Sequence, residues 1–109
     1  MNLGDIFKQA RDLQERLGET QEMLKAISVT GESGGGLVKV TLNGRFEALR
    51  VEIEPGLDED RGVLEDLIAA AMNDAVRRVE AAQKEKMTDL AARLGLPPGM
   101  NLPGGLASP

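Results

Sequence analysis

Residues 30–44 read TGESGGGLVKVTLNG, and this stretch combines a glycine run, a strand and a turn signal. From Val38 to Leu42 apolar residues alternate with polar ones, which is the period-two pattern of a strand that buries one face. Asn43-Gly44 follows directly and is a strong hairpin signal between two alternating segments. The stretch therefore predicts an antiparallel sheet in the middle of the chain.

The glycine run Gly34–Gly36 has two interpretations, a phosphate cradle or a bend between strands. A Walker-type loop needs a Lys-Ser/Thr pair and a helix after the glycines, and a dinucleotide fingerprint needs a helix there too. Here another strand follows at Leu37. We therefore expect a glycine-rich hairpin connection with positive φ angles rather than a nucleotide site.

Two more strands are expected beside the central one. SVTGES at 28–33 is short and compatible with β structure, and RFEALRVEIE at 45–54 alternates until Pro55-Gly56. The alternation changes phase near Ala48-Leu49. This change indicates a β-bulge, although a strand buried on both faces gives a similar pattern.

The N-terminal segment carries a heptad seam that predicts a long, coiled-coil-like helix. Its members recur at alternating spacings of three and four: Leu3, Ile6, Ala10, Leu13, Leu17, Thr20, Leu24 and Ile27. A second long helix is expected after Asp58-Glu59-Asp60 and has no Gly or Pro until Gly95. Carboxylates suit a helix start, so we prefer that interpretation of the acidic cluster to a metal site.

The predicted fold class is α+β: a long N-terminal helix, a three-stranded antiparallel β-meander and a long C-terminal helix. We expect a single domain at 1–95 and a Pro/Gly-rich tail at 96–109, extended or disordered. The sheet is too small to cover both helices along their length. Their overhanging halves must therefore pair with each other, project as an arm or meet a second chain, and a homodimer is the economical solution.

Composition limits the chemistry that this chain can perform. Its 109 residues contain no Cys and no His, which excludes disulfides, thiolate metal sites and the commonest general base. Ser28, Ser33 and Ser108 have no base nearby in sequence. We expect no enzyme activity, no cofactor and no metal. No secretion signal or apolar span of about 20 residues is visible, which favours a cytoplasmic protein without a membrane partner.

The net charge of −5 argues against a nucleic-acid ligand, but the charge is unevenly distributed. Residues 57–74 hold six acids and one base, whereas residues 75–95 hold five bases and three acids. Lys8 and Arg11 lie three apart, off the seam, on one outer face. Two such arms in a dimer would straddle a polyanion, although mixed charge on a long helix is usually only a solvated surface.

Long segments of the chain resemble the bacterial YbaB/EbfC family of nucleoid-associated proteins. They are VTGESGGGLVKVTLNG, RVEIEPGL, LEDLIAAAMNDAVRRVEAAQKEKM and LPPGM, in this order between about Phe7 and Pro103. The resemblance implies a cytoplasmic, nucleoid-associated homodimer shaped like tweezers, which binds duplex DNA with little sequence preference and alters its conformation. DNA contacts in the family are attributed to helical arms, which points here to Lys8, Arg11, Arg16, Arg77, Arg78, Lys84, Lys86 and Arg93.

Two functions follow as hypotheses. The favoured one is a nucleoid-associated protein that contacts duplex DNA through its phosphates and affects nucleoid organisation and gene expression. The alternative is a protein-interaction scaffold whose coiled-coil-like helices engage a partner in DNA metabolism. Salt separates the two, because phosphate contacts weaken steeply as salt rises whereas an apolar contact persists.

Overall fold

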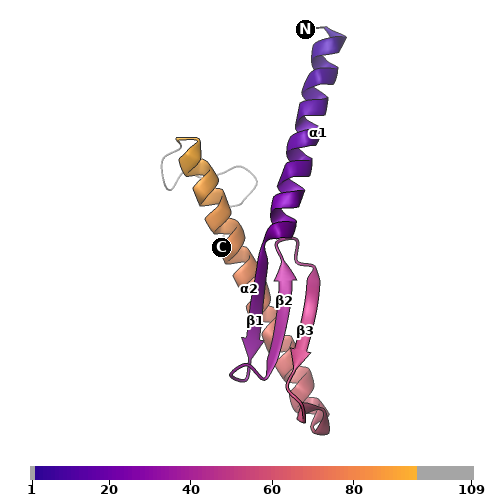
Figure 1. The fold of residues 1–109 in the computed structure, drawn as a ribbon, viewed down its shortest axis with the longest axis vertical. Helices are drawn as coiled ribbons and strands as arrows, with labels where there is room; N and C mark the ends of the chain where they lie inside the picture. Colours follow the sequence, from indigo (N-terminus) through magenta and orange to yellow (C-terminus); the bar gives the residue numbers. More distant parts are fainter. Residues whose placement is uncertain (1, 96–109) are drawn as a thin grey trace.

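The structure is a computed structural model that describes residues 2–95, so the tail predicted at 96–109 lies outside the described residues. A small sheet follows one long helix in the chain and precedes another (Figure 1). The elements are α1 (Leu3–Ala26), β1 (Ser28–Ser33), β2 (Val38–Asn43), β3 (Ala48–Ile53), a 3-10 turn η1 (Leu57–Glu59) and α2 (Arg61–Arg93). The predicted α+β class and element order are confirmed.

The three strands form one antiparallel sheet in the order β1-β2-β3, with β2 in the centre. Thr41 of β2 lies opposite Arg50 of β3, but Leu42 lies opposite Ala48. Leu49 is therefore an extra residue in β3. The change of phase in the sequence was a β-bulge, as predicted, and not a strand buried on both faces.

Both connections in the sheet have left-handed residues. Gly34, Gly35 and Gly36 have φ angles of 62°, 71° and 98°, so the glycine run is a bend that suits residues without a Cβ. The hairpin predicted at Asn43-Gly44 is also present, but residues 44–47 connect its strands and Phe46 has a φ of 61°. The Asn43 side chain organises this longer connection.

Asn43 accepts two backbone hydrogen bonds through Oδ1, from the N–H of Arg45 at 2.9 Å and from the N–H of Glu47 at 3.1 Å. Its Nδ2 donates to the Glu47 carboxylate at 2.9 Å. This hydrogen bond, followed by the charge of Arg45, lowers the pKa of Glu47. One buried Asn therefore replaces the two-residue turn that an Asn-Gly pair usually makes.

The core lies between one face of the sheet and α2. It consists of Val38, Val40 and Leu42 from β2 and Ala71, Ala75 and Val79 from α2, all at most 1% exposed. The helix approaches β1 closely because both surfaces are small: a Cβ at Gly31 would overlap the backbone of Ala71 and Ala75. α2 consequently packs on β1 and β2, and its C-terminal end extends beyond the sheet (Figure 1).

α1 projects from the sheet as an arm and has no buried residue. The chain measures 67 × 30 × 19 Å, with a radius of gyration of 19.2 Å. A compact chain of 109 residues would have a radius of gyration of about 13 Å. Of the three arrangements expected for the overhanging helix halves, the structure has them diverging from the sheet as two separate arms (Figure 1).

A small junction holds the base of α1. The N–H of Gly44, in the β2–β3 connection, donates to the Leu24 carbonyl at 2.9 Å. The Gln83 side chain of α2 donates to the Gly44 carbonyl at 2.7 Å. Ile27, which ends α1, is buried beside this junction. Gly44 thus connects both arms to the sheet where they begin to diverge.

Candidate nucleic-acid interface

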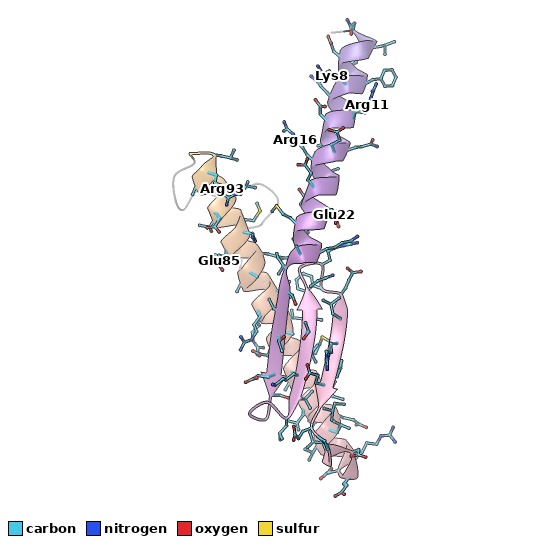
Figure 2. All side chains as sticks on the ribbon, in the orientation of Figure 1. Lys8, Arg11, Arg16, Glu22, Glu85 and Arg93 are labelled. Atoms are coloured by element: carbon cyan, nitrogen blue, oxygen red, sulfur yellow. The ribbon has the colours of Figure 1, made fainter. Side chains whose placement is uncertain are left out.

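The three predicted basic residues of α1 lie along its exposed length (Figure 2). At 100° per residue, Lys8 and Arg11 are about 60° apart and Arg16 is about 140° from Arg11, so the three do not form one row. Lys8 and Arg16 extend toward the side of α1 on which α2 lies in Figure 2. Asp12 and Glu15 lie between these bases on the helix surface, and this arm therefore carries both charges.

Arg77 and Arg78 of α2 are engaged within the chain. Arg78 Nε lies 3.0 Å from Asp74 Oδ2, and Arg77 lies 3.6 Å from Asp74 Oδ1. Asp74 also accepts the backbone N–H of Glu32 from β1 at 2.9 Å. This backbone hydrogen bond, followed by the bond from Arg78, lowers the pKa of Asp74. The two arginines therefore stabilise a carboxylate that joins α2 to the sheet.

The remaining basic residues of α2 lie on the part that extends beyond the sheet. At 100° per residue, Lys86 and Arg93 fall within about 20° of Ala75, whereas Lys84 is about 180° away. The helix face that packs on the sheet therefore continues into the outer part of α2 with Lys86 and Arg93. Figure 2 shows Arg93 on the side of α2 that faces α1. Sequence spacing alone did not separate these two residues from Lys84.

Six of the eight predicted residues form no ion pair within 4.0 Å in the part of the chain that the structure describes: Lys8, Arg11, Arg16, Lys84, Lys86 and Arg93. Their cationic groups are exposed and available to an anionic partner. The engagement of Arg77 and Arg78 had a sequence signal, because Asp74 precedes them by three and four residues.

The acidic half of the molecule is separated from the arms. η1 and the first turns of α2, which hold the acids predicted near residues 58–66, lie at the end of the molecule opposite the arm tips (Figure 1). Asp66 and Lys86 are about 30 Å apart along the helix axis. That distance is several times the Debye length of about 8 Å at physiological ionic strength. The net charge of −5 therefore does not describe the arms.

The acidic cluster before α2 has a structural role. Asp60 Oδ1 accepts the Val63 N–H at 3.2 Å and caps the helix, as the helix-start interpretation predicted. Within residues 2–95, no three carboxylates gather closely enough to hold a metal ion. Neither of the two helices described is long and apolar enough to cross a membrane.

The comparisons with known proteins agree with this architecture. The chain is similar to the crystal structure of HP0035, an uncharacterized protein from Helicobacter pylori, with a TM-score of 0.66 and 26% sequence identity. The match covers 83% of this chain and 97% of that chain. Residues 1–94 match the YbaB/EbfC DNA-binding family, which is a non-catalytic family. The resemblance found in the sequence is thereby confirmed, and the chain belongs to the YbaB/EbfC DNA-binding family.

Proposed function

We propose that this protein is a nucleoid-associated homodimer that binds duplex DNA with little sequence specificity, alters its conformation and so affects nucleoid organisation and gene expression. Membership of a DNA-binding family supports the ligand. The observation that carries the mode of binding is the pair of diverging arms, whose cationic groups are separated from the acidic end of the chain (Figures 1 and 2). This function places the protein in the cytoplasm, at the nucleoid.

Binding in this proposal is electrostatic. Lysine and arginine groups contact phosphates and release counterions, so the affinity falls as salt rises, with a log-log slope of about −0.9 for each phosphate contacted. Sequence-independent affinities of this kind are ordinarily about 10⁻⁴–10⁻⁶ M at physiological salt. Acids on the same arms, such as Glu85 and Asp89, keep the affinity modest.

The positions on the helices rank the candidate residues. By helix geometry, Lys86 and Arg93 continue the face of α2 that packs on the sheet. Lys8 and Arg16 extend from α1 toward the side on which α2 lies (Figure 2). We assign phosphate contact first to these four residues. Arg11 and Lys84 are secondary, and Arg77 and Arg78 contribute least because Asp74 engages them.

The homodimer is supported by apolar surface that one chain leaves exposed. The apolar side chains of β3 are exposed in one chain: Leu49 is 58% exposed, Val51 49% and Ile53 42%. A second copy is the simplest cover for such surface in a homo-oligomer.

The experiment is fluorescence anisotropy with two unrelated duplexes across a salt series, on three variants. Lys86→Glu is expected to weaken binding several-fold and to reduce the salt slope by about one contact for each chain bound. Lys84→Glu is the matched control, with the same charge change two residues away on the opposite face, and its effect should be clearly smaller. The double variant Lys84→Glu/Lys86→Glu should weaken binding further without unfolding the protein.

Equal losses of DNA affinity in the two single variants would reject a site on the face of α2 that packs on the sheet. They would indicate a general effect of the changed charge instead. Absence of binding to either duplex at low salt would reject DNA as the ligand. Asp89→Asn offers a change of opposite sign, because it removes an acid about 40° from Ala75 on the helix surface and should strengthen binding.

The second candidate is the protein-interaction scaffold, which the exposed α1 seam favours. A partner in DNA metabolism would then pack on Leu13, Leu17 and their neighbours. Leu13→Asp/Leu17→Asp should abolish that contact and leave salt-sensitive DNA binding intact. Loss of DNA binding in this variant, with the fold retained, would instead connect the seam to the DNA-binding assembly.

A further inference from the structure

The two outer edges of the sheet differ, because α2 covers part of the edge of β1. The backbone N–H of Glu32 donates to Asp74 at 2.9 Å, and the Ser33 hydroxyl donates to the Leu67 carbonyl at 2.6 Å. Proteins cover exposed strand edges in this way because unpaired backbone groups recruit further strands. α2 therefore occupies the outer side of β1 at Glu32 and Ser33.

The edge of β3 is open. All six of its residues are exposed, and within residues 2–95 no strand lies beyond it (Figure 1). The N–H of Glu54 donates inward to the Leu37 carbonyl of the β2 side at 2.9 Å. Backbone groups alternate in an antiparallel pair, so those of Val51 and Ile53 point outward. β3 therefore presents free donors and acceptors to solvent.

The same strand has an uncovered apolar face. Val51 lies opposite Val40, and Ile53 lies opposite Val38, so these four side chains share the face on which α2 packs. Val40 and Val38 are fully buried, whereas Val51 and Ile53 are 49% and 42% exposed. The core thus continues onto β3 as an apolar strip that α2 does not reach.

The polar face of β3 is complementary to itself. Arg50 and Glu52 lie two residues apart on that face, exposed, with their charged groups 3.1 Å apart. In an antiparallel pair of β3 strands centred on Val51, Arg50 lies opposite the partner's Glu52, and the reverse contact occurs by symmetry. Moving the centre to Arg50 or to Glu52 places like charges opposite one another, which is destabilising. Of these three registers, the charges favour the one centred on Val51.

We propose that β3 pairs antiparallel with β3 of a second copy of this chain, centred on Val51, to form a continuous six-stranded sheet. This inference rests on the proposed homodimer and names its interface. The symmetry axis of such a pair is perpendicular to the sheet, so both α2 helices lie on one face and the apolar strips meet at the centre. The arms of the two copies then point to opposite ends of the six-stranded sheet.

Cysteine cross-linking of the full chain tests the register, because the protein has no native Cys. Residues directly opposite in a hydrogen-bonded pair have Cα atoms about 5.5 Å apart, within the range of about 4.4–6.8 Å that a disulfide spans. Val51→Cys should therefore form a disulfide dimer in a glutathione redox buffer. Ile53→Cys is the matched control on the same strand and face. Its copies would be more than about 10 Å apart and should stay unlinked.

Charge reversal supplies an independent test by sedimentation equilibrium. Arg50→Glu alone and Glu52→Arg alone each place like charges opposite one another twice in the dimer, and each should raise the dimer dissociation constant on the order of tenfold. The double variant R50E/E52R restores opposite charges and should restore the constant. Both side chains are exposed, so far-UV circular dichroism should show an unchanged fold in all three variants.

The outcomes separate this inference from the proposed function. A dimer whose dissociation constant is unchanged by Arg50→Glu and by Glu52→Arg, and which fails to cross-link at Val51→Cys, overturns the β3 interface while leaving the homodimer and DNA binding standing. A chain that is monomeric at all concentrations overturns the interface and the homodimer together, whatever its DNA affinity. Selective cross-linking at Val51→Cys with rescue in the double variant supports the six-stranded sheet even if DNA binding fails.

Discussion

α1 and α2 are both long helices with interspersed charges, yet only α2 belongs to the core. α2 buries Ala71, Ala75 and Val79 against the sheet, whereas α1 buries no residue. The α1 seam is regular, but Leu13 and Leu17 remain more than half exposed. Regular apolar spacing therefore predicts a helix and its apolar face. Which element packs on that face depends on how the connections arrange the helices and the sheet. Three pairs of substitutions and one single substitution can break or sharpen this contrast.

The largest expected difference in stability is between two leucine-to-alanine substitutions, one in β2 beneath α2 and one on α1. Leu42→Ala removes a side chain that is 1% exposed, and it should lower the free energy of unfolding by about 3–4 kcal/mol. Leu13→Ala, at 58% exposure, should cost less than about 0.5 kcal/mol. Urea denaturation at low protein concentration measures both. A large cost at Leu13 would mean that another surface covers the seam in solution.

A glycine-to-alanine substitution should lower stability at Gly31, which contacts α2, and raise it at Gly18 of α1. Gly31→Ala forces a methyl group into the backbone of Ala71 and Ala75, and it should destabilise the protein by about 1–3 kcal/mol or more. Gly18→Ala meets no atom within 4 Å on α1. It should increase helicity there, with a local gain of about 0.5–1 kcal/mol. Thermal unfolding followed at 222 nm distinguishes the two, and destabilisation by Gly18→Ala would show that α1 is packed.

Removing the N-terminal caps of α2 and α1 should produce smaller and more local differences in stability. Asp60 caps α2 through the Val63 N–H at 3.2 Å, and Asn2 caps α1 through the Asp5 N–H at 2.9 Å. Removal of a cap costs about 1 kcal/mol of helix stability. Asp60→Ala should therefore shift the global urea midpoint, because α2 unfolds with the core. Asn2→Ala should only fray the first turn of α1, visible as lost amide protection there; equal global shifts would contradict this.

The smallest effect concerns the link from α2 to β1. The Glu32 N–H and Arg78 hold the pKa of Asp74 below its unfolded value of about 3.9. A depressed carboxyl pKa stabilises the folded state above about pH 4, and this contribution is lost as the pH falls through the folded pKa. Asp74→Asn should thus lower stability at pH 7, and the difference from the original protein should shrink as the pH falls below about 4. A difference that stays the same over this pH range would assign the loss to packing instead of charge.

The sheet and both helices could be predicted because local patterns decided them. The alternation from Val38 to Leu42, the change of phase at Leu49 and the acids before α2 each have a short-range cause, and the structure contains the corresponding strand, bulge and cap. The connection after Asn43 differed from a two-residue turn because one side chain accepts two backbone N–H groups, which no dipeptide signal reveals.

The candidate interface was predicted less completely. The sequence identified the basic residues, but which face each occupies depends on where α2 leaves the sheet. That point is set by the contact of Gly31 with Ala71 and Ala75, which lies far from Lys84 and Lys86 in the chain. The spacing of Asp74 and Arg78 indicated their ion pair, but the contact of Asp74 with Glu32 of β1 had no such signal. Long-range contacts of this kind have no local signature.

The lack of buried residues in α1 also has a kinetic consequence. Amide protons in a helix without tertiary contacts exchange with solvent through opening of that helix alone, whereas those around Ala75 require unfolding of the core. Hydrogen–deuterium exchange should divide the chain near Ile27, with rapid exchange before it and slow exchange in β2 and the middle of α2. Slower exchange along α1 in the presence of a ligand or a second copy would then identify the residues that become covered.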